Sequence, residues 1–325
     1  MRTPLSAITF AAALALAGCD FEDLHGSFGN AQAYKEDFHH TYPLKAGGRL
    51  ALENFNGSVE IAGWEKDSVD ISGTKYGASE ALRDSIKIDI VATADTIRIR
   101  TVRPYDRRGN LGARYVIRVP RKTELDPITS SNGSMKVEGV EGVARLRTSN
   151  GSVRTIKLRG NLDVSTSNAS IDVVDLDGPA NVRTSNGRVT AEGVRGAFEA
   201  TTSNGGIRAH LAKSEARRPV RLETSNGGIE LTMDSANEND VRASTSNGGI
   251  TLRLPDTIGA RVRAHTSNAS ISTEFDVRRE GSTSSRNHLE GTIGAGGPTL
   301  DLSTSNGSIR LLKVSNERLL TRAAR

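Results

Sequence analysis

The chain has a single cysteine, Cys19, among its 325 residues. One cysteine excludes an intramolecular disulfide, so packing and backbone hydrogen bonds alone must hold the fold. Aromatic residues are also scarce, at 4% of the sequence, while hydrophobic residues of all kinds make up 36%. So few large rings indicate a thin core of aliphatic side chains and threonine rather than a thick globular core. The length allows one or two domains.

Signatures of enzymes and of cofactor sites are absent as well. The sequence has no Gly-x-Ser-x-Gly elbow, no phosphate-binding loop and no Gly-Gly-x-Gly-x-Asp calcium repeat. Its six histidines show no metal-ligand spacing. Asp172, Asp175 and Asp177 lie close together, but an outward position and a turn-like sequence favour structural roles for them. We therefore expect no cofactor, no metal and no enzymatic activity.

Neither sign of charge dominates the sequence. Forty-three basic residues face 38 acidic ones, which gives a formal net charge of +5. This balance indicates a mixed, solvated surface with a mild basic excess. The excess is compatible with an anionic partner such as an envelope glycan or lipid head groups.

The N-terminal segment has the features of an export signal. Arg2 precedes a mostly apolar stretch from Leu5 to Leu16, which is too short to span a bilayer. The sequence Leu16-Ala17-Gly18-Cys19 resembles the bacterial lipoprotein signal, in which the chain is cleaved before an acylated cysteine. The resemblance implies a mature chain of 325 − 18 = 307 residues, held on a membrane by acyl chains on Cys19.

Asp20 follows the cysteine directly. In enterobacterial lipoproteins an aspartate at this place resembles the signal for retention in the inner membrane. We therefore favour the inner membrane, facing the periplasm, and leave the outer membrane open. An exported chain with few aromatic residues for base stacking is not expected to bind nucleic acid.

One tetrapeptide, Thr/Ser-Ser-Asn followed by Gly or Ala, recurs along the chain. Successive asparagines are 18, 18, 18, 18, 22, 21, 21 and 38 residues apart. A period near twenty residues is typical of stacked-repeat proteins. The last gap is about twice the others, so we expect one degenerate or interrupted repeat there. The repeated asparagines are Asn132, Asn150, Asn168, Asn186, Asn204, Asn226, Asn247, Asn268 and Asn306.

The residues around each asparagine keep a strict register. Threonine stands two places before it in eight of the nine repeats, and an aliphatic residue or methionine stands three places after it in all nine. Apolar and polar residues alternate on both sides, which predicts strand, turn and strand with one face buried. We expect Asn-Gly to supply the turn through positive φ angles, and Asn168 and Asn268 to do so where alanine follows.

Two all-β folds fit this register. In an antiparallel meander each Asn-Gly would form a hairpin turn. In a parallel β-solenoid (β-helix) each Asn-Gly would form a corner, and like residues of successive coils would stack on one another. The constancy of the register favours the solenoid, with about nine to ten coils.

Composition and pattern suggest five segments. The last of them, a basic tail, is expected to cap the open end of the stack. The segments are a lipoprotein signal peptide (1–18), a flexible linker with the acylated cysteine (19–45), an irregular N-terminal β region (46–127), regular solenoid repeats with a protruding loop near 274–298 (128–313), and the tail (314–325).

Three features together resemble a bacterial family of unknown function whose members are named as adhesins. They are the segment Leu52 to Trp64, the run Tyr115 to Pro120, and the Thr-Ser-Asn-Gly repeats. The resemblance covers residues 46–314. It implies a β-solenoid on the outer side of the cytoplasmic membrane, and it implies no activity, because the name rests on similarity rather than on demonstrated binding.

The sequence offers one candidate binding surface. Arg221, Arg242 and Arg263 share one outward position in successive repeats and predict a short basic strip for an anionic glycan or lipid. We therefore expect a non-enzymatic, lipid-anchored envelope protein that serves as an adhesin or scaffold and contacts an envelope glycan or another envelope protein. A polysaccharide-active β-helix enzyme and an accessory protein of an envelope-stress system remain alternatives.

Overall fold

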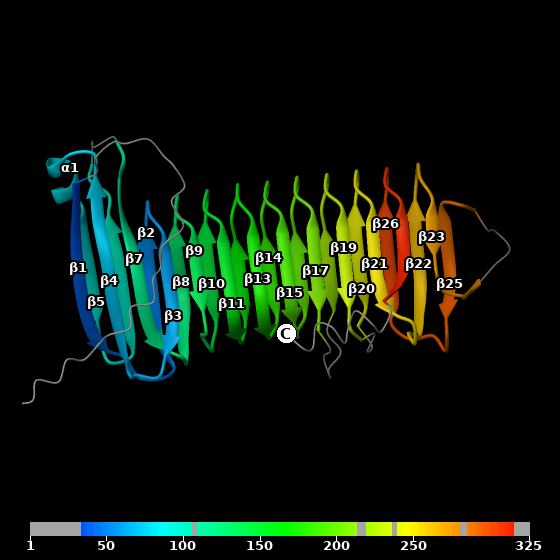
Figure 1. Ribbon diagram of the computed structural model, residues 1–325, viewed down its shortest axis with the longest axis horizontal. Coiled ribbons are helices and arrows are strands. Elements are labelled where there is room, and N and C mark those ends of the chain that lie inside the picture. The colour runs from blue at the N-terminus through cyan, green and yellow to red at the C-terminus, as the bar shows by residue number, and fades with distance from the viewer. Residues whose placement is uncertain (1–33, 106–108, 213–218, 236–238, 280–284, 315–325) are drawn as a thin grey trace, which may run out of the picture. The chain divides into compact units, whose positions relative to one another are not determined.

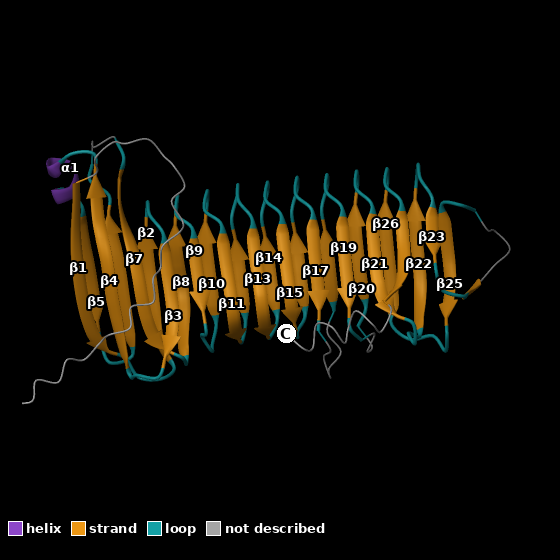
Figure 2. Cartoon of the chain, in the orientation of Figure 1, coloured by secondary structure: helices purple, strands orange, loops and turns teal. Residues whose placement is uncertain are grey.

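The computed structural model describes residues 34–105, 109–212, 219–235, 239–279 and 285–314 (Figure 1). Cys19, the expected signal peptide and the C-terminal tail from residue 315 lie outside the described residues. Almost every described element is a β-strand (Figure 2). No helix in the described part of the chain has the length and apolar character needed to cross a membrane.

The strands follow one another with short connections and a single five-residue helix. The N-terminal elements are β1 (Tyr34–Pro43), β2 (Gly48–Asn54), β3 (Val59–Trp64), β4 (Ser68–Gly77), α1 (Glu80–Asp84), β5 (Lys87–Ala92), β6 (Thr96–Val102) and β7 (Leu111–Pro120). The central elements are β8 (Thr123–Ser130), β9 (Met135–Glu138), β10 (Ala144–Thr148), β11 (Val153–Arg159), β12 (Leu162–Ser165), β13 (Ile171–Asp177), β14 (Ala180–Arg183), β15 (Val189–Val194), β16 (Phe198–Thr201), β17 (Ile207–Leu211), β18 (Val220–Glu223), β19 (Ile229–Met233), β20 (Val241–Thr245) and β21 (Ile250–Pro255). The C-terminal elements are β22 (Ala260–Thr266), β23 (Ile271–Thr273), β24 (Val277–Arg279), β25 (His288–Ile293), β26 (Thr299–Thr304) and β27 (Ile309–Val314).

These strands form a parallel β-solenoid, which confirms the predicted fold class and excludes the meander. One sheet has 13 strands and the other has 14. Each coil contributes one strand to each sheet, and neighbouring coils pair in parallel, as β10 does with β12 and β11 with β13. Eleven such coils lie along the stack, somewhat more than the nine to ten expected: β6–β7, β2–β3, β8–β9, β10–β11, β12–β13, β14–β15, β16–β17, β18–β19, β20–β21, β26–β27 and β22–β23.

The core is a thin aliphatic layer between the two sheets. Leu146 and Val164 are partners in neighbouring coils, and both are fully buried. The residue three places after each central asparagine is also buried, as Ile229 shows with no exposed surface. The alternation seen in the sequence therefore identifies the inward face correctly.

The corners differ from the prediction in their backbone geometry. Among the corner glycines only Gly57 has a φ angle in the left-handed region, at +113°, and neither Asn168 nor Asn268 does. Gly151 is favoured for a steric reason instead, because an ideal Cβ on it would lie 1.8 Å from the carbonyl oxygen of Gly133 in the next coil. Ala169 and Ala269 occupy the same position, so two corners accommodate a methyl group.

At the C-terminal end the order of coils in space differs from their order in the sequence. The last coil, β26–β27, lies between β20–β21 and β22–β23 (Figure 1). The expectation of a last coil that closes the array is therefore wrong. Of the two expectations for the long gap, an interruption by β24 and β25 is found rather than a degenerate repeat. The expected protruding loop near 274–298 is largely replaced by β24 and β25, which cover the edge of β22 with antiparallel pairing.

The N-terminal end is also covered by antiparallel strands. β4 pairs with β7, β1 pairs with β4, and β5 pairs with β6. The expectation of a flexible linker up to residue 45 is therefore wrong for Tyr34–Pro43, which forms β1. Phe38 explains the difference, because it is half-buried and its ring meets that of Tyr115 edge-on at 5.6 Å. Charged neighbours concealed this strand in the sequence.

Candidate functional site

The repeated asparagines form one continuous ladder along the corners of the coils. In each step Nδ2 of one asparagine donates to Oδ1 of the asparagine before it in the ladder, at 2.7 or 2.8 Å. The ladder begins at Asn56, which the spacing of the later repeats did not include. Its order in space is Asn56, Asn132, Asn150, Asn168, Asn186, Asn204, Asn226, Asn247, Asn306 and Asn268.

The threonines two places earlier form a second, buried ladder. The Oγ1 atom of Thr166 donates to the carbonyl oxygen of Gly151 at 3.1 Å, and Thr202 does the same to Gly187 at 3.0 Å. These bonds satisfy carbonyl groups that would otherwise be buried without partners. Together the two ladders fix each corner onto the next, which gives the asparagines a structural role as proposed from the sequence.

The predicted basic strip is not continuous. Arg221 and Arg242 are partners in neighbouring strands, but Asp301 of the inserted coil lies between Arg242 and Arg263. The Nε atom of Arg221 lies 2.8 Å from Glu223, and that of Arg263 lies 3.2 Å from Glu290. The strip is therefore interrupted and largely neutralised, and only the order of the strands in space reveals this.

The aspartates at 172, 175 and 177 lie in one strand, β13 (Ile171–Asp177). Asp177 lies 3.6 Å from Arg159 of the neighbouring coil in an ion pair. Asp175 holds a φ angle of +53° within β13. Their contacts support the structural interpretation.

His210 of β17, in the 13-stranded sheet, brings two carboxylates together. Its Nδ1 atom lies 3.0 Å from Glu192, and its Nε2 atom lies 2.7 Å from Asp234. Because both ring nitrogens face carboxylates, these contacts favour the doubly protonated form of the imidazole. The hydrogen bond that His210 donates to Asp234 is the largest cause that raises the pKa of His210, and the charge of Glu192 adds to it.

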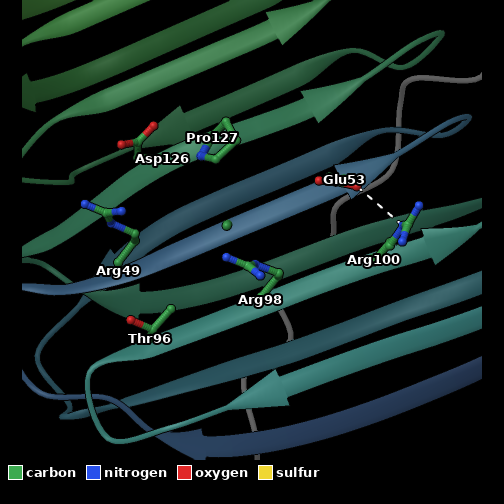
Figure 3. Close-up of a pocket in the computed structure, with 8 residues that line it drawn as sticks. Arg49, Glu53, Thr96, Arg98, Arg100, Asp126 and Pro127 are labelled. Carbon is green, nitrogen blue, oxygen red and sulfur yellow. Dashed lines mark ion pairs between the residues drawn. The ribbon is translucent and has the colours of Figure 1, made fainter.

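A basic hollow on the outer face of the 14-stranded sheet was not found from the sequence. Figure 3 shows Arg49 of β2 and Arg98 and Arg100 of β6 around it. Its volume is about 460 Å³. Ala51 forms its floor and Pro127 of β8 forms part of its wall. The signal that could have revealed it is Ala51 itself, an alanine at an outward position that is charged or polar from the repeat of Asn150 onward.

Some of the charged residues around the hollow form ion pairs with one another and some do not. Arg49 lies 3.3 Å from Glu124, and Arg100 lies 3.5 Å from Glu53. Asp126, at the rim, pairs with Arg145 of the next coil instead. Arg98 forms no ion pair with any residue of the described ranges. Among those residues no group of three or more His, Cys, Asp or Glu side chains has the arrangement of a metal site.

Comparisons with known proteins identify the fold. A family model described as Toastrack DUF4097 matches residues 49–312. No curated protein matches the chain. A solved structure of a candidate adhesin from Bacteroides fragilis is 12% identical, with a TM-score of 0.40, and the match covers 85% of this chain and 97% of that one.

Two further solved structures are similar over most of their length. A candidate cell adhesion protein from Clostridium sporogenes is 11% identical with a TM-score of 0.21, over 86% of this chain and 100% of that one. A candidate adhesin from Parabacteroides distasonis is 6% identical with a TM-score of 0.28, over 87% of this chain and 98% of that one.

Proposed function

Since the chain belongs to the Toastrack DUF4097 family, we propose that it is a lipid-anchored, non-enzymatic envelope protein that presents a rigid β-solenoid as a contact surface. The anchor is the acylated Cys19, and the partner is an anionic envelope glycan or another envelope protein. Asp20 favours the inner membrane. The protein acts as an adhesin or scaffold at that surface.

The observation that carries this proposal is the unbroken ladder from Asn56 to Asn268. Each coil is tied to the next by backbone pairing, by the asparagine amides and by the buried threonines. Stacked coils of this kind offer an extended surface that keeps its shape without a ligand, which suits contacts at many points. Such a surface supports adhesion or scaffolding better than chemistry at one deep site.

The anchor is tested by metabolic labelling with a radioactive fatty acid, followed by separation of inner and outer membranes. The proposal expects label on the wild-type protein in the inner membrane and none on Cys19→Ser. Label that persists on Cys19→Ser would refute the anchor. Label in the outer membrane alone would refute the role of Asp20 but retain the anchor.

The non-enzymatic role is tested separately with the purified chain and envelope polysaccharides. The proposal expects no new reducing ends and no unsaturated products. Either product, lost in Asp172→Asn or Asp177→Asn, would favour the polysaccharide-active alternative.

A further inference from the structure

The hollow over Ala51 exists because of two local features of the sheet. Leu50 and Leu52 are fully buried, so Ala51 between them faces outward. In β8, Leu125 pairs with Leu50 and Ile128 pairs with Leu52, and the register shifts between them. Asp126 and Pro127 therefore both lie opposite Ala51 as a bulge. The short side chain of Ala51 thus lies beside the bulge formed by Asp126 and Pro127, which leaves a hollow above it.

Ala51 replaces a larger polar side chain. It stands five places before its asparagine, at the outward position between two inward residues. In the coil of Asn132 this position is Pro127, and from the coil of Asn150 onward it carries a charged residue or asparagine. These residues are Arg145, Asp163, Asn181, Glu199, Arg221, Arg242, Arg263 and Asp301.

Arg98 is the residue that distinguishes this hollow from the rest of the sheet. Its partners in the neighbouring strands are Ala51 and Val91, neither of which carries a charge. Arg263, by contrast, has Asp301 on one side and Glu290 on the other. Arg98 is thus an exposed cation with no carboxylate directly opposite it on either strand.

The other two arginines lie beside Arg98, but each is paired with a carboxylate, Arg49 with Glu124 and Arg100 with Glu53, so Arg98 carries the uncompensated charge of the hollow. Arg100 follows Arg98 on the same outward face of β6, and Arg49 lies diagonally across from Arg98 on β2. Figure 3 shows all three at the rim of the hollow. Guanidinium groups bind carboxylates through two parallel hydrogen bonds, so Arg98 can take an anionic ligand without giving up an ion pair within the protein.

The hollow also offers apolar surface beside the charge. Pro127 and Ala51 line it, and Val91, next to Arg98, is 63% exposed. The C–H face of a sugar ring fits such surface, while its carboxylate reaches the arginines. The volume of about 460 Å³ lies within the range of small-molecule sites, about 300–1,000 Å³.

We propose that this hollow binds an acidic saccharide unit, with the sugar carboxylate on Arg98 between Arg49 and Arg100 and the ring against Pro127. The inference rests on the proposed envelope role and names the chemistry of the partner. It moves the anionic contact from the interrupted strip at Arg221 to the N-terminal third of the stack.

The test is calorimetric titration of the purified full chain in detergent with trigalacturonate and with its neutral methyl ester. We expect the acid to bind and the ester to bind at least tenfold more weakly. Arg98→Gln should weaken binding of the acid about tenfold, and Ala51→Glu should abolish it by placing a carboxylate in the hollow. Arg98 is exposed, so Arg98→Gln should keep the wild-type melting curve. Ala51 is only 7% exposed, so Arg98→Gln decides the outcome by itself if Ala51→Glu fails to fold.

Arg263→Gln is the matched control, since Arg263 faces outward on the same sheet but is paired with Glu290. It should leave binding of trigalacturonate unchanged. Equal affinity of wild type and Arg98→Gln, or of acid and ester, would overturn the proposal. A loss with Arg263→Gln alone would also overturn it, in favour of the strip.

Inorganic phosphate serves as a second probe. Binding of phosphate that depends on Arg98, without binding of trigalacturonate, would assign the hollow to phosphate and overturn the saccharide. These titrations use purified protein, so they stand even if labelling at Cys19 fails. Conversely, a failed titration leaves the anchor untouched.

Discussion

The Nδ2 atom of Asn306 donates a hydrogen bond to Oδ1 of Asn247 at 2.7 Å, across 59 residues of sequence. Asn268, which lies between them in the sequence, instead follows Asn306 in the ladder. After β20–β21 the chain therefore leaves space for one coil and forms the terminal coil, β22–β23, with β24 and β25 covering its edge. It then returns and places β26–β27 in the space that was left. The last coil is consequently held by parallel partners on both sides.

Loss of one ladder amide should destabilise the stack modestly. In Asn186→Ala, the bonds to Asn168 and Asn204 are both lost. Because the amides are exposed, we expect the free energy of unfolding to fall by about 1–2 kcal/mol, measured by urea denaturation. Asn181→Ala is the control, at an outward position away from the ladder, and should change stability by less than about 0.5 kcal/mol. Equal effects of the two substitutions would show that the ladder adds no stability.

One buried hydroxyl lowers the stability of the core. Thr155 is 1% exposed, and its Oγ1 atom has no hydrogen-bond partner in the described part of the chain. Its partners in the two neighbouring coils are both valine, Val137 and Val173. Thr155→Val should therefore raise the free energy of unfolding by about 1 kcal/mol. A decrease in the melting temperature would show that the hydroxyl has a partner.

A charged side chain on the inward face should be far more harmful. Ile229 has no exposed surface and lies between Ile207 and Ile250. Ile229→Asp would bury a carboxylate without a partner and should unfold the neighbouring coils. Glu230→Asp, the next residue and an outward one, is the control. An unchanged melting curve for Ile229→Asp would contradict the inward assignment.

Stability should depend on pH through His210. Its pKa is raised in the folded chain, first by Asp234, so its contribution is fully present below the ordinary histidine pKa, about 6.5. That contribution is lost as the pH rises through the raised pKa of the folded state. The melting temperature of wild type should therefore fall between about pH 6 and pH 9 by more than that of His210→Gln. His40→Gln should keep the wild-type profile, and identical profiles for wild type and His210→Gln would refute the role of the cation.

The sequence is enough to predict the structure of a single coil, but not the order in which all the coils stack. Alternation around each asparagine identifies the inward face, and the constant register favours parallel stacking. Every coil, however, presents the same Thr-Ser-Asn edge, so the coil of Asn306 fits equally well before or after that of Asn268. The choice depends on the antiparallel pairing of β25 with β22, which no local pattern indicates.

The candidate sites were likewise predictable only in part, because they too depend on the order of the coils in space. The basic strip was inferred from arginines at equal repeat positions, but the inserted coil places Asp301 among them. The hollow could be suspected from Ala51 at an outward position. The isolation of Arg98, however, depends on β6 lying beside β2, although β3, β4 and β5 separate these two strands in the sequence.

Cysteine cross-linking tests the inserted coil, and with it the solenoid, most directly. In a Cys19→Ala background, Ser246→Cys with Ser305→Cys places thiols on adjacent coils, whose backbones meet where Asn306 N–H donates to Ser246 at 2.9 Å. We expect this pair to form a disulfide on mild oxidation. Ser246→Cys with Ser267→Cys should not, because the coil β26–β27 lies between them and keeps them two strand spacings apart, about 10 Å, beyond the reach of a disulfide. Cross-linking of the second pair and not the first would contradict the account.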